Sequence, residues 1–157
     1  MTLGATKYIG QRITRREDRR FLTGRTNYVD DIRLPRTVHA AFVRSQEAHA
    51  EVLSVRTERA LAHRGVFGVL TSEEAALLSR PIRCDSTFPE WKGTEFPVLA
   101  WPRVRFVGEA VAIVAAVDRY TAEDAAELVD VEYRPLPTVA DLETAAEPGS
   151  DLIHEAW

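Results

Sequence analysis

Cysteine is nearly missing from this sequence, since Cys84 is the only one among 157 residues. A single thiol cannot close an internal disulfide, so nothing in the chain requires an oxidising compartment. An iron–sulfur cluster takes about four thiolates, which this chain cannot supply. We therefore expect Cys84 to be an ordinary semi-buried thiol in a loop.

Long apolar runs are missing too. The longest, from Ala110 to Val117, is far shorter than the roughly 20 residues that a membrane-spanning helix needs. The first residues, MTLGATKYIGQRITRRED, lack the apolar stretch of a secretory signal peptide. The sequence thus predicts a cytoplasmic protein with no membrane partner.

A strong positive charge is also absent, because the net charge is −4. Basic residues cluster near the N-terminus, and the carboxylates of residues 17, 18, 30 and 31 interrupt or flank them. The basic residues are Arg12, Arg15, Arg16, Arg19, Arg20 and Arg25. Nucleic-acid binding requires a concentrated basic field. A salt-bridged face or a protein-binding surface is the better interpretation, and no nucleic-acid partner is expected.

Sequence motifs for chemistry are absent as well. The chain has no Gly-x-Gly-x-x-Gly or P-loop for phosphates and no Gly-x-Ser-x-Gly elbow for a nucleophile. The histidines are scattered, and only His39 and His49 lie on neighbouring predicted strands, without a third ligand. Glu109 follows Gly108 at a tight junction, where it faces either a pocket or solvent. The residues alone therefore assign no catalytic, cofactor-binding or metal-binding group.

Alternating and helical patterns of apolar residues are what the sequence does contain. They predict an α/β or α+β domain with a mixed sheet and short flanking helices. The predicted strands cover residues 38–45, 51–57, 66–70, 104–107, 111–117 and 131–133. Helices are expected after two capping signals, Thr71 with Glu74 and Thr121 with Asp124. A further helix is expected over residues 58–63, capped by Thr57 and stopped by Gly65. Asp141 is expected to cap a last turn.

One strand stands out, because residues 111–117 are apolar on both faces. This pattern is typical of a central strand. We expect Val111, Ile113, Ala115 and Val117 to share one face of it. The Gly108-Glu109 turn is predicted to pair this strand with residues 104–107. Residues 38–45 are expected to form a well-buried strand.

Two segments fall outside this regular pattern. Residues 1–36 are polar and basic, and we expect an extended arm anchored by residues such as Phe21 and Tyr28. Residues 79–102 contain four prolines and are predicted to be a long structured loop carrying four large aromatics, Phe88, Trp91, Phe96 and Trp101. Loops of this length are often functional or packed against something.

Four segments resemble the large subunits of molybdenum hydroxylases, the xanthine dehydrogenase, aldehyde oxidase and carbon monoxide dehydrogenase family. They are IGQRITRREDRRFLTGRTNYVDDIRLP, VHAAFVRSQEAHAEV, RGVFGVLT and VRFVGEAVAIVAAVDRYTAEDAAELVDVEYRPLP, in the family's order and spacing. The chain departs from the family at Gln46, Arg64 and Ala110, where proline is usual. The resemblance identifies the domain as the family's N-terminal α/β hammerhead.

The resemblance implies a domain organisation: an arm over residues 1–36, the hammerhead over 37–147, and the start of a linker to a missing molybdopterin-binding domain over 148–157. In such enzymes the molybdenum–molybdopterin cofactor and the catalytic glutamate belong to later domains. FAD and iron–sulfur clusters lie on partner subunits or domains. The isolated chain is therefore expected to bind no cofactor and to catalyse nothing. The family oxidises purines, aldehydes, carbon monoxide and heterocycles, so no substrate is assigned.

The role that remains is structural and docking. We expect the remainder of the large subunit and the FAD and iron–sulfur subunits as partners. The candidate docking surface comprises Arg16, Arg19, Phe21, Phe88, Trp91, Phe96 and Trp101. In the alternative interpretation, these aromatics fill the domain's own core and the arm wraps it. At the level of function, the alternatives are a stand-alone interaction module or a gene remnant without redox activity.

Overall fold

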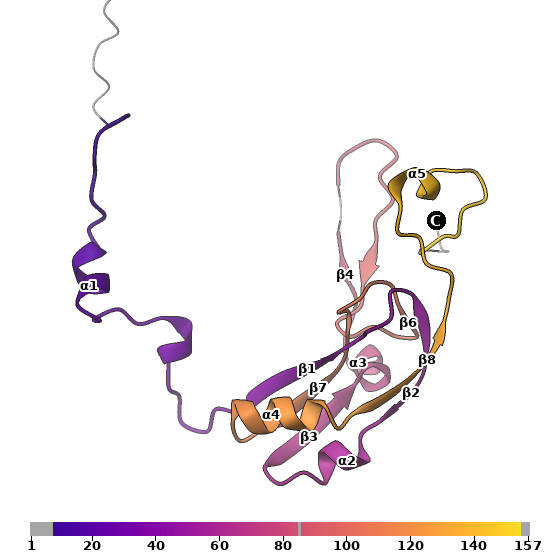
Figure 1. Ribbon diagram of the computed structural model, residues 1–157, viewed down its shortest axis with the longest axis horizontal. Helices are drawn as coiled ribbons and strands as arrows, with labels where there is room; N and C mark the ends of the chain where they lie inside the picture. Colours follow the sequence, from indigo (N-terminus) through magenta and orange to yellow (C-terminus); the bar gives the residue numbers. More distant parts are fainter. Residues whose placement is uncertain (1–7, 85, 155–157) are drawn as a thin grey trace, which may run out of the picture. The chain divides into compact units, whose positions relative to one another are not determined.

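The computed structural model describes residues 8–84 and 86–154. The chain divides between Thr37 and Val38 into two compact units, an arm and a body, and each is described by itself. Figure 1 shows their secondary structure.

From residue 8 onward the arm contains two short helical turns, α1 (Asp18–Leu22) and the 3-10 helix η1 (Val29–Asp31). Asp18 pairs with Arg15 at 3.2 Å, and the Arg15 guanidinium lies 5.6 Å from the centre of the Phe21 ring. The Phe21 and Tyr28 ring centres are 6.1 Å apart. The arm thus contains local helical structure, which the prediction of an extended arm did not include.

The first sheet of the body is antiparallel, with strand order β1-β7-β3. Its strands are β1 (His39–Arg44), β7 (Ala110–Ala116) and β3 (Val66–Thr71). The prediction that β7 is the central strand is confirmed. The prediction of a well-buried β1 was wrong, because β1 is an edge strand whose residues alternate between half-buried and exposed.

The predicted faces of β7 agree with the alternation of burial from residue 112 to 116, and Val111 is the residue that departs from it. Ala112, Val114 and Ala116 form the fully buried face, while Ile113 and Ala115 are half-buried. Val111 is fully buried as well and belongs to the core cluster under the second sheet. The first residues of β7 therefore contribute to a different part of the core than the later ones.

The second sheet has the order β6-β2-β8 and is also antiparallel. It consists of β6 (Arg103–Val104), β2 (Ala50–Arg56) and β8 (Asp130–Pro135). The predicted pairing of residues 104–107 with β7 was wrong, since β6 pairs with β2. Gly108, at a φ of +91°, redirects the chain, and the Ser45 carbonyl accepts its N–H at 2.7 Å.

In the described part of the body, four helices accompany the sheets: α2 (Glu58–Leu61), α3 (Ser72–Leu78), α4 (Arg119–Ala126) and α5 (Leu142–Ala145). The capping box of Thr71 and Glu74 is confirmed. So is the Asp141 cap, which accepts the Thr144 N–H at 2.9 Å. Among the described residues, no helix is both long and apolar enough to cross a membrane.

Two capping predictions were wrong. Helix α4 begins earlier than expected, because Asp118 rather than Thr121 is its cap and accepts the Thr121 N–H at 2.8 Å. An aspartate three residues ahead competes well for this position. Helix α2 ends at Leu61, before Gly65, and the Thr57 side chain makes no capping bond.

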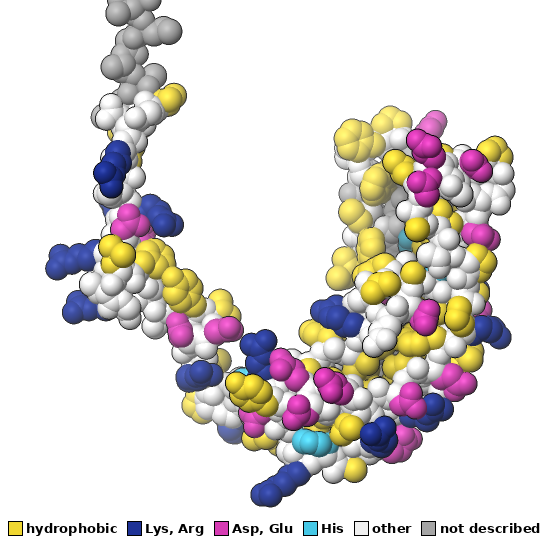
Figure 2. Space-filling model, viewed as in Figure 1, with side chains coloured by type: hydrophobic (Ala, Val, Ile, Leu, Met, Phe, Trp, Pro, Cys, Tyr) yellow, Lys and Arg dark blue, Asp and Glu magenta, His cyan; other side chains and the backbone are white. Residues whose placement is uncertain are grey.

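The predicted loop over residues 79–102 carries a small hairpin that the sequence did not reveal. Its strands are β4 (Ile82–Arg83) and β5 (Glu95–Phe96). Two residues per strand are too few for an alternating pattern to be recognised. Hydrophobic side chains gather over this end of the body in Figure 2.

Candidate docking surfaces and the Glu109 pocket

The hairpin places three of the predicted aromatics at the surface. Phe88 is 75% exposed, Trp91 48% and Phe96 44%. The Trp91 indole N–H donates to the Cys84 carbonyl at 3.1 Å, which fixes the ring against the hairpin. Because its polar group is already satisfied, the remaining face of Trp91 offers only apolar contact. We call Phe88, Trp91 and Phe96 the hairpin surface.

The fourth aromatic lies in a different environment. Trp101 is half-buried and packs against the core cluster that contains Ala100 and Val104. In the arm, Arg16 and Arg19 are exposed and Phe21 is 39% exposed. The structure therefore brings three of the seven candidate residues together on the hairpin.

Glu109 faces a small pocket. Its side chain is 9% exposed, and its carboxylate accepts the backbone N–H of Arg105. Burial raises the pKa of Glu109, and the opposing effect of the Arg105 N–H only partly offsets it. The carboxylate thus bridges the turn between β6 and β7 through its hydrogen bond to the Arg105 N–H.

The pocket holds only about 30 Å³, room for one water molecule and too little for a substrate. Residues from three segments line it: Glu95, Phe96, Pro97, Arg105, Phe106, Glu109 and His154. Arg105 also donates to the Ile153 carbonyl at 3.3 Å. Burial, and then the charge of Arg105, lowers the pKa of His154. Sequence reasoning missed this grouping because His154 is distant along the chain.

The remaining candidate groups do not assemble into a reactive site. Cys84 is exposed rather than semi-buried. His39 lies on β1 of the first sheet, whereas His49 precedes β2 of the second, where its Nδ1 is 2.7 Å from the Pro137 carbonyl. The predicted adjacency of their strands was wrong. Within residues 8–84 and 86–154, no three His, Cys, Asp or Glu side chains cluster as metal ligands.

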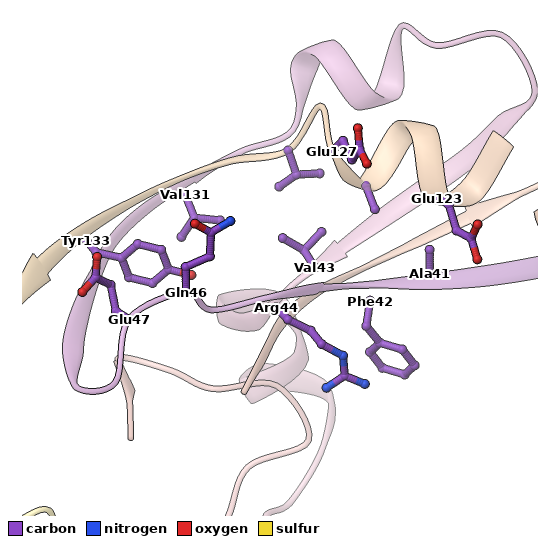
Figure 3. Close-up of a pocket in the computed structure, with 12 residues that line it drawn as sticks. Ala41, Phe42, Val43, Arg44, Gln46, Glu47, Glu123, Glu127, Val131 and Tyr133 are labelled. Carbon is purple, nitrogen blue, oxygen red and sulfur yellow. The ribbon is translucent and has the colours of Figure 1, made fainter. Parts of the chain in front are cut away.

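A larger groove lies between β1, α4 and β8 (Figure 3). Its volume is about 680 Å³. Its lining comes from the two strands, the helix and the turns beside them: Ala41, Phe42, Val43, Arg44, Gln46, Glu47, Glu123, Ala126, Glu127, Val129, Val131 and Tyr133. Local sequence patterns did not predict the groove, because the groove depends on how the two sheets meet.

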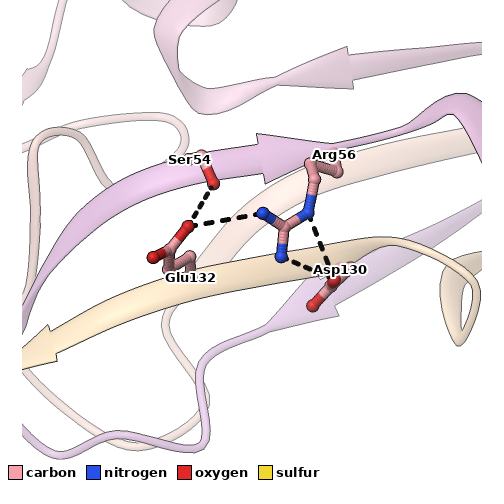
Figure 4. A network of polar contacts seen from close by, with 4 residues as sticks. All are labelled: Ser54, Arg56, Asp130 and Glu132. Carbon is pink, nitrogen blue, oxygen red and sulfur yellow. Dashed lines mark hydrogen bonds and ion pairs between the residues drawn. The ribbon is translucent and has the colours of Figure 1, made fainter.

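A polar network crosses the outer part of the second sheet (Figure 4). Arg56 on β2 donates to Asp130 at 2.8 Å and to Glu132 at 3.3 Å on β8. The bond to Asp130 is the main cause of the raised pKa of Arg56. Ser54 also donates to Glu132. All these side chains lie at the surface, so the network fixes strand register rather than forming a reactive site.

Two antiparallel sheets with short helices are the fold found in solved molybdenum hydroxylases. The structure of quinoline 2-oxidoreductase from Pseudomonas putida 86 matches with a TM-score of 0.83 at 43% identity. That match covers 86% of this chain and 17% of the solved chain. The model of the aldehyde oxidase and xanthine dehydrogenase a/b hammerhead domain matches residues 23–137. The chain belongs to this family.

Curated relatives agree. The carbon monoxide dehydrogenase large chain of Afipia carboxidovorans is 43% identical over 147 residues, which cover 94% of this chain and 18% of the relative. The xanthine dehydrogenase molybdenum-binding subunit of Escherichia coli O157:H7 is 36% identical, over 85% of this chain and 18% of the relative. The chain thus spans less than a fifth of the length of these relatives.

Proposed function

We propose that this chain acts as the N-terminal hammerhead domain of a molybdenum-dependent hydroxylase or dehydrogenase large subunit, with a structural and docking role. The hairpin surface is the observation that carries the proposal. Three large aromatics stand exposed on one hairpin, and such side chains anchor protein interfaces when a partner covers them. Docking of the remainder of a large subunit would cover them.

The proposal assigns no complete active site to the chain. Hydroxylation at a metal centre needs a fixed metal, a base and a shaped substrate pocket. The described residues contain no cluster of metal ligands, and the Glu109 pocket is too small for a substrate. The molybdenum–molybdopterin cofactor would belong to the rest of the large subunit, with FAD and iron–sulfur clusters on partner subunits. No step of the reaction is assigned to residues of this chain.

Two measurements on the purified chain test the proposal. Metal analysis and a dye-reduction assay with hypoxanthine and with an aldehyde should give no molybdenum and no turnover. Sedimentation should show self-association, because exposed apolar patches that a partner normally covers tend to associate. Amide exchange should be fast in residues 16–21 and 88–96. Stoichiometric molybdenum, turnover, or a strict monomer with slow exchange in both segments would contradict the proposal.

A further inference from the structure

The groove between β1, α4 and β8 has an apolar floor. Val43 and Val131 lie at the floor and pack against the buried core clusters of the body, and Val129 beside them is itself a buried member of one cluster. Ala41 and Val43 point from β1 toward α4, whereas Phe42 and Arg44 point to the opposite side of the strand (Figure 3). The floor is therefore a continuation of the core that the chain's own elements leave open.

Two edge strands border this floor. Strand β1 ends one sheet and β8 ends the other. In an antiparallel ladder, every second residue of an edge strand turns its N–H and C=O groups away from its partner. Such groups bind an added extended segment through backbone hydrogen bonds, with side-chain pockets providing specificity. The form of ligand that suits this border is an extended chain.

The charges at the groove have one predominant sign. Glu123 and Glu127 come from α4 and its end, and Glu47 from the turn after β1. Among the residues that line the groove, the cation is Arg44, and its guanidinium points away from the groove. It donates to the Gly108 carbonyl at 2.8 Å and lies 5.4 Å from the centre of the Phe42 ring. Arg119 pairs with Glu123 at 2.8 Å, which leaves Glu47 and Glu127 as the main carboxylates at the rim.

From these three features we infer that the groove binds an extended segment of a partner protein in which arginine or lysine alternates with apolar residues. Its apolar side chains would cover Val43, Val129 and Val131, and its cations would face Glu47 and Glu127. Strand addition would also cover an open edge, which is otherwise prone to unwanted pairing. This surface is separate from the hairpin surface, and the inference does not depend on the docking role proposed there.

A direct test uses the full 157-residue chain and a fluorescein-labelled peptide of eight alternating valines and arginines. Fluorescence anisotropy should show saturable binding, and amide exchange in residues 40–44 should slow on binding. The double variant Glu47→Gln and Glu127→Gln should bind about fivefold more weakly, because each ion pair near the surface contributes a little. Circular dichroism would verify that the substitutions, one at the half-buried Glu47 and one at the exposed Glu127, leave the fold intact.

Matched controls separate this site from general attraction to an acidic protein. The double variant Glu58→Gln and Glu143→Gln removes the same charge from exposed positions outside the groove, and its affinity should change less than about twofold. A peptide of alternating valines and glutamates should not bind. Methylation of alternate backbone nitrogens should abolish binding of the arginine peptide. The inference would be overturned if either control peptide bound as tightly as the arginine peptide, or if both double variants weakened binding equally.

Discussion

Strand β7 and the β4–β5 hairpin distribute their apolar residues in opposite ways. On β7, small side chains are fully buried, with Val111, Ala112 and Val114 at 0% exposure. On the hairpin, Phe88 and Trp91 remain 75% and 48% exposed. A large aromatic offers roughly 150–250 Å² for burial, far more than an alanine. Small residues of β7 thus lie in the core, while two large aromatics of the hairpin remain exposed.

The small residues of β7 have a geometric reason. This strand pairs with β1 on one side and β3 on the other, and α4 packs over β1 and β7. Ala112 and Ala125, from β7 and α4, meet in one buried cluster at 0% exposure. Short side chains allow the helix to approach the sheet closely, and a larger residue there would overpack the core.

The largest effect in this comparison should come from a charge placed on β7. Val114→Asp should unfold the domain, since Val114 is fully buried and an unpaired buried charge costs several kcal/mol. Thermal unfolding by circular dichroism measures the effect. Val107→Asp is the control, because Val107 is 64% exposed and should tolerate the change. Equal melting temperatures for Val114→Asp and the parent chain would contradict the buried placement of β7.

A smaller loss should follow the removal of the Glu109 carboxylate. Glu109→Ala leaves the Arg105 N–H without its acceptor, and an unsatisfied buried donor costs about 1–3 kcal/mol. Glu109→Gln keeps an acceptor oxygen and should lose much less. Chemical denaturation of both variants measures the difference. Equal losses would show that the charge, rather than the hydrogen bond, is what matters at this turn.

The raised pKa of Glu109 also predicts a pH dependence. The folded state holds the proton to higher pH than the unfolded chain, whose glutamate titrates at its ordinary value of 4.5. The stability that Glu109 contributes is thus complete below the unfolded pKa and is lost as pH rises through the raised folded pKa. The free energy of unfolding of the parent chain, relative to that of Glu109→Gln, should therefore fall as pH rises through the folded pKa of Glu109. A difference that is constant with pH would contradict the assignment.

A still smaller effect is expected at the start of α4. Asp118→Ala removes the side chain that accepts the Thr121 N–H and should lower the melting temperature by a few degrees, whereas Asp118→Asn should retain the cap. The hydrogen bonds from Thr121 lower the pKa of Asp118. Its ionised cap therefore stabilises the fold above the unfolded pKa, and this contribution disappears as pH falls through the lowered value. Equal loss in both variants would argue against capping.

The sequence predicted features that depend on local patterns. The apolar run of β7 and the Thr71–Glu74 capping box were recognisable because each lies within a few neighbouring residues. The pairing of β6 with β2 was not, since Gly108 redirects the chain and Ser45, distant in sequence, holds the turn. The groove was missed for a similar reason, because its lining comes from separate elements of two sheets. Non-local pairings leave no periodic trace in the sequence.

The smallest effect on stability should come from the hairpin surface. The double variant Phe88→Ser and Trp91→Ser should change the free energy of unfolding by less than about 1 kcal/mol, because exposed side chains contribute little to a fold. The same variant should bind less hydrophobic dye and self-associate less. Trp101→Ser should behave in the opposite way: Trp101 packs on the core, so stability should fall while dye binding by the folded protein persists. If the hairpin variant unfolded instead, the aromatics would belong to the domain's own core, and the surface offered to a partner would have to lie elsewhere.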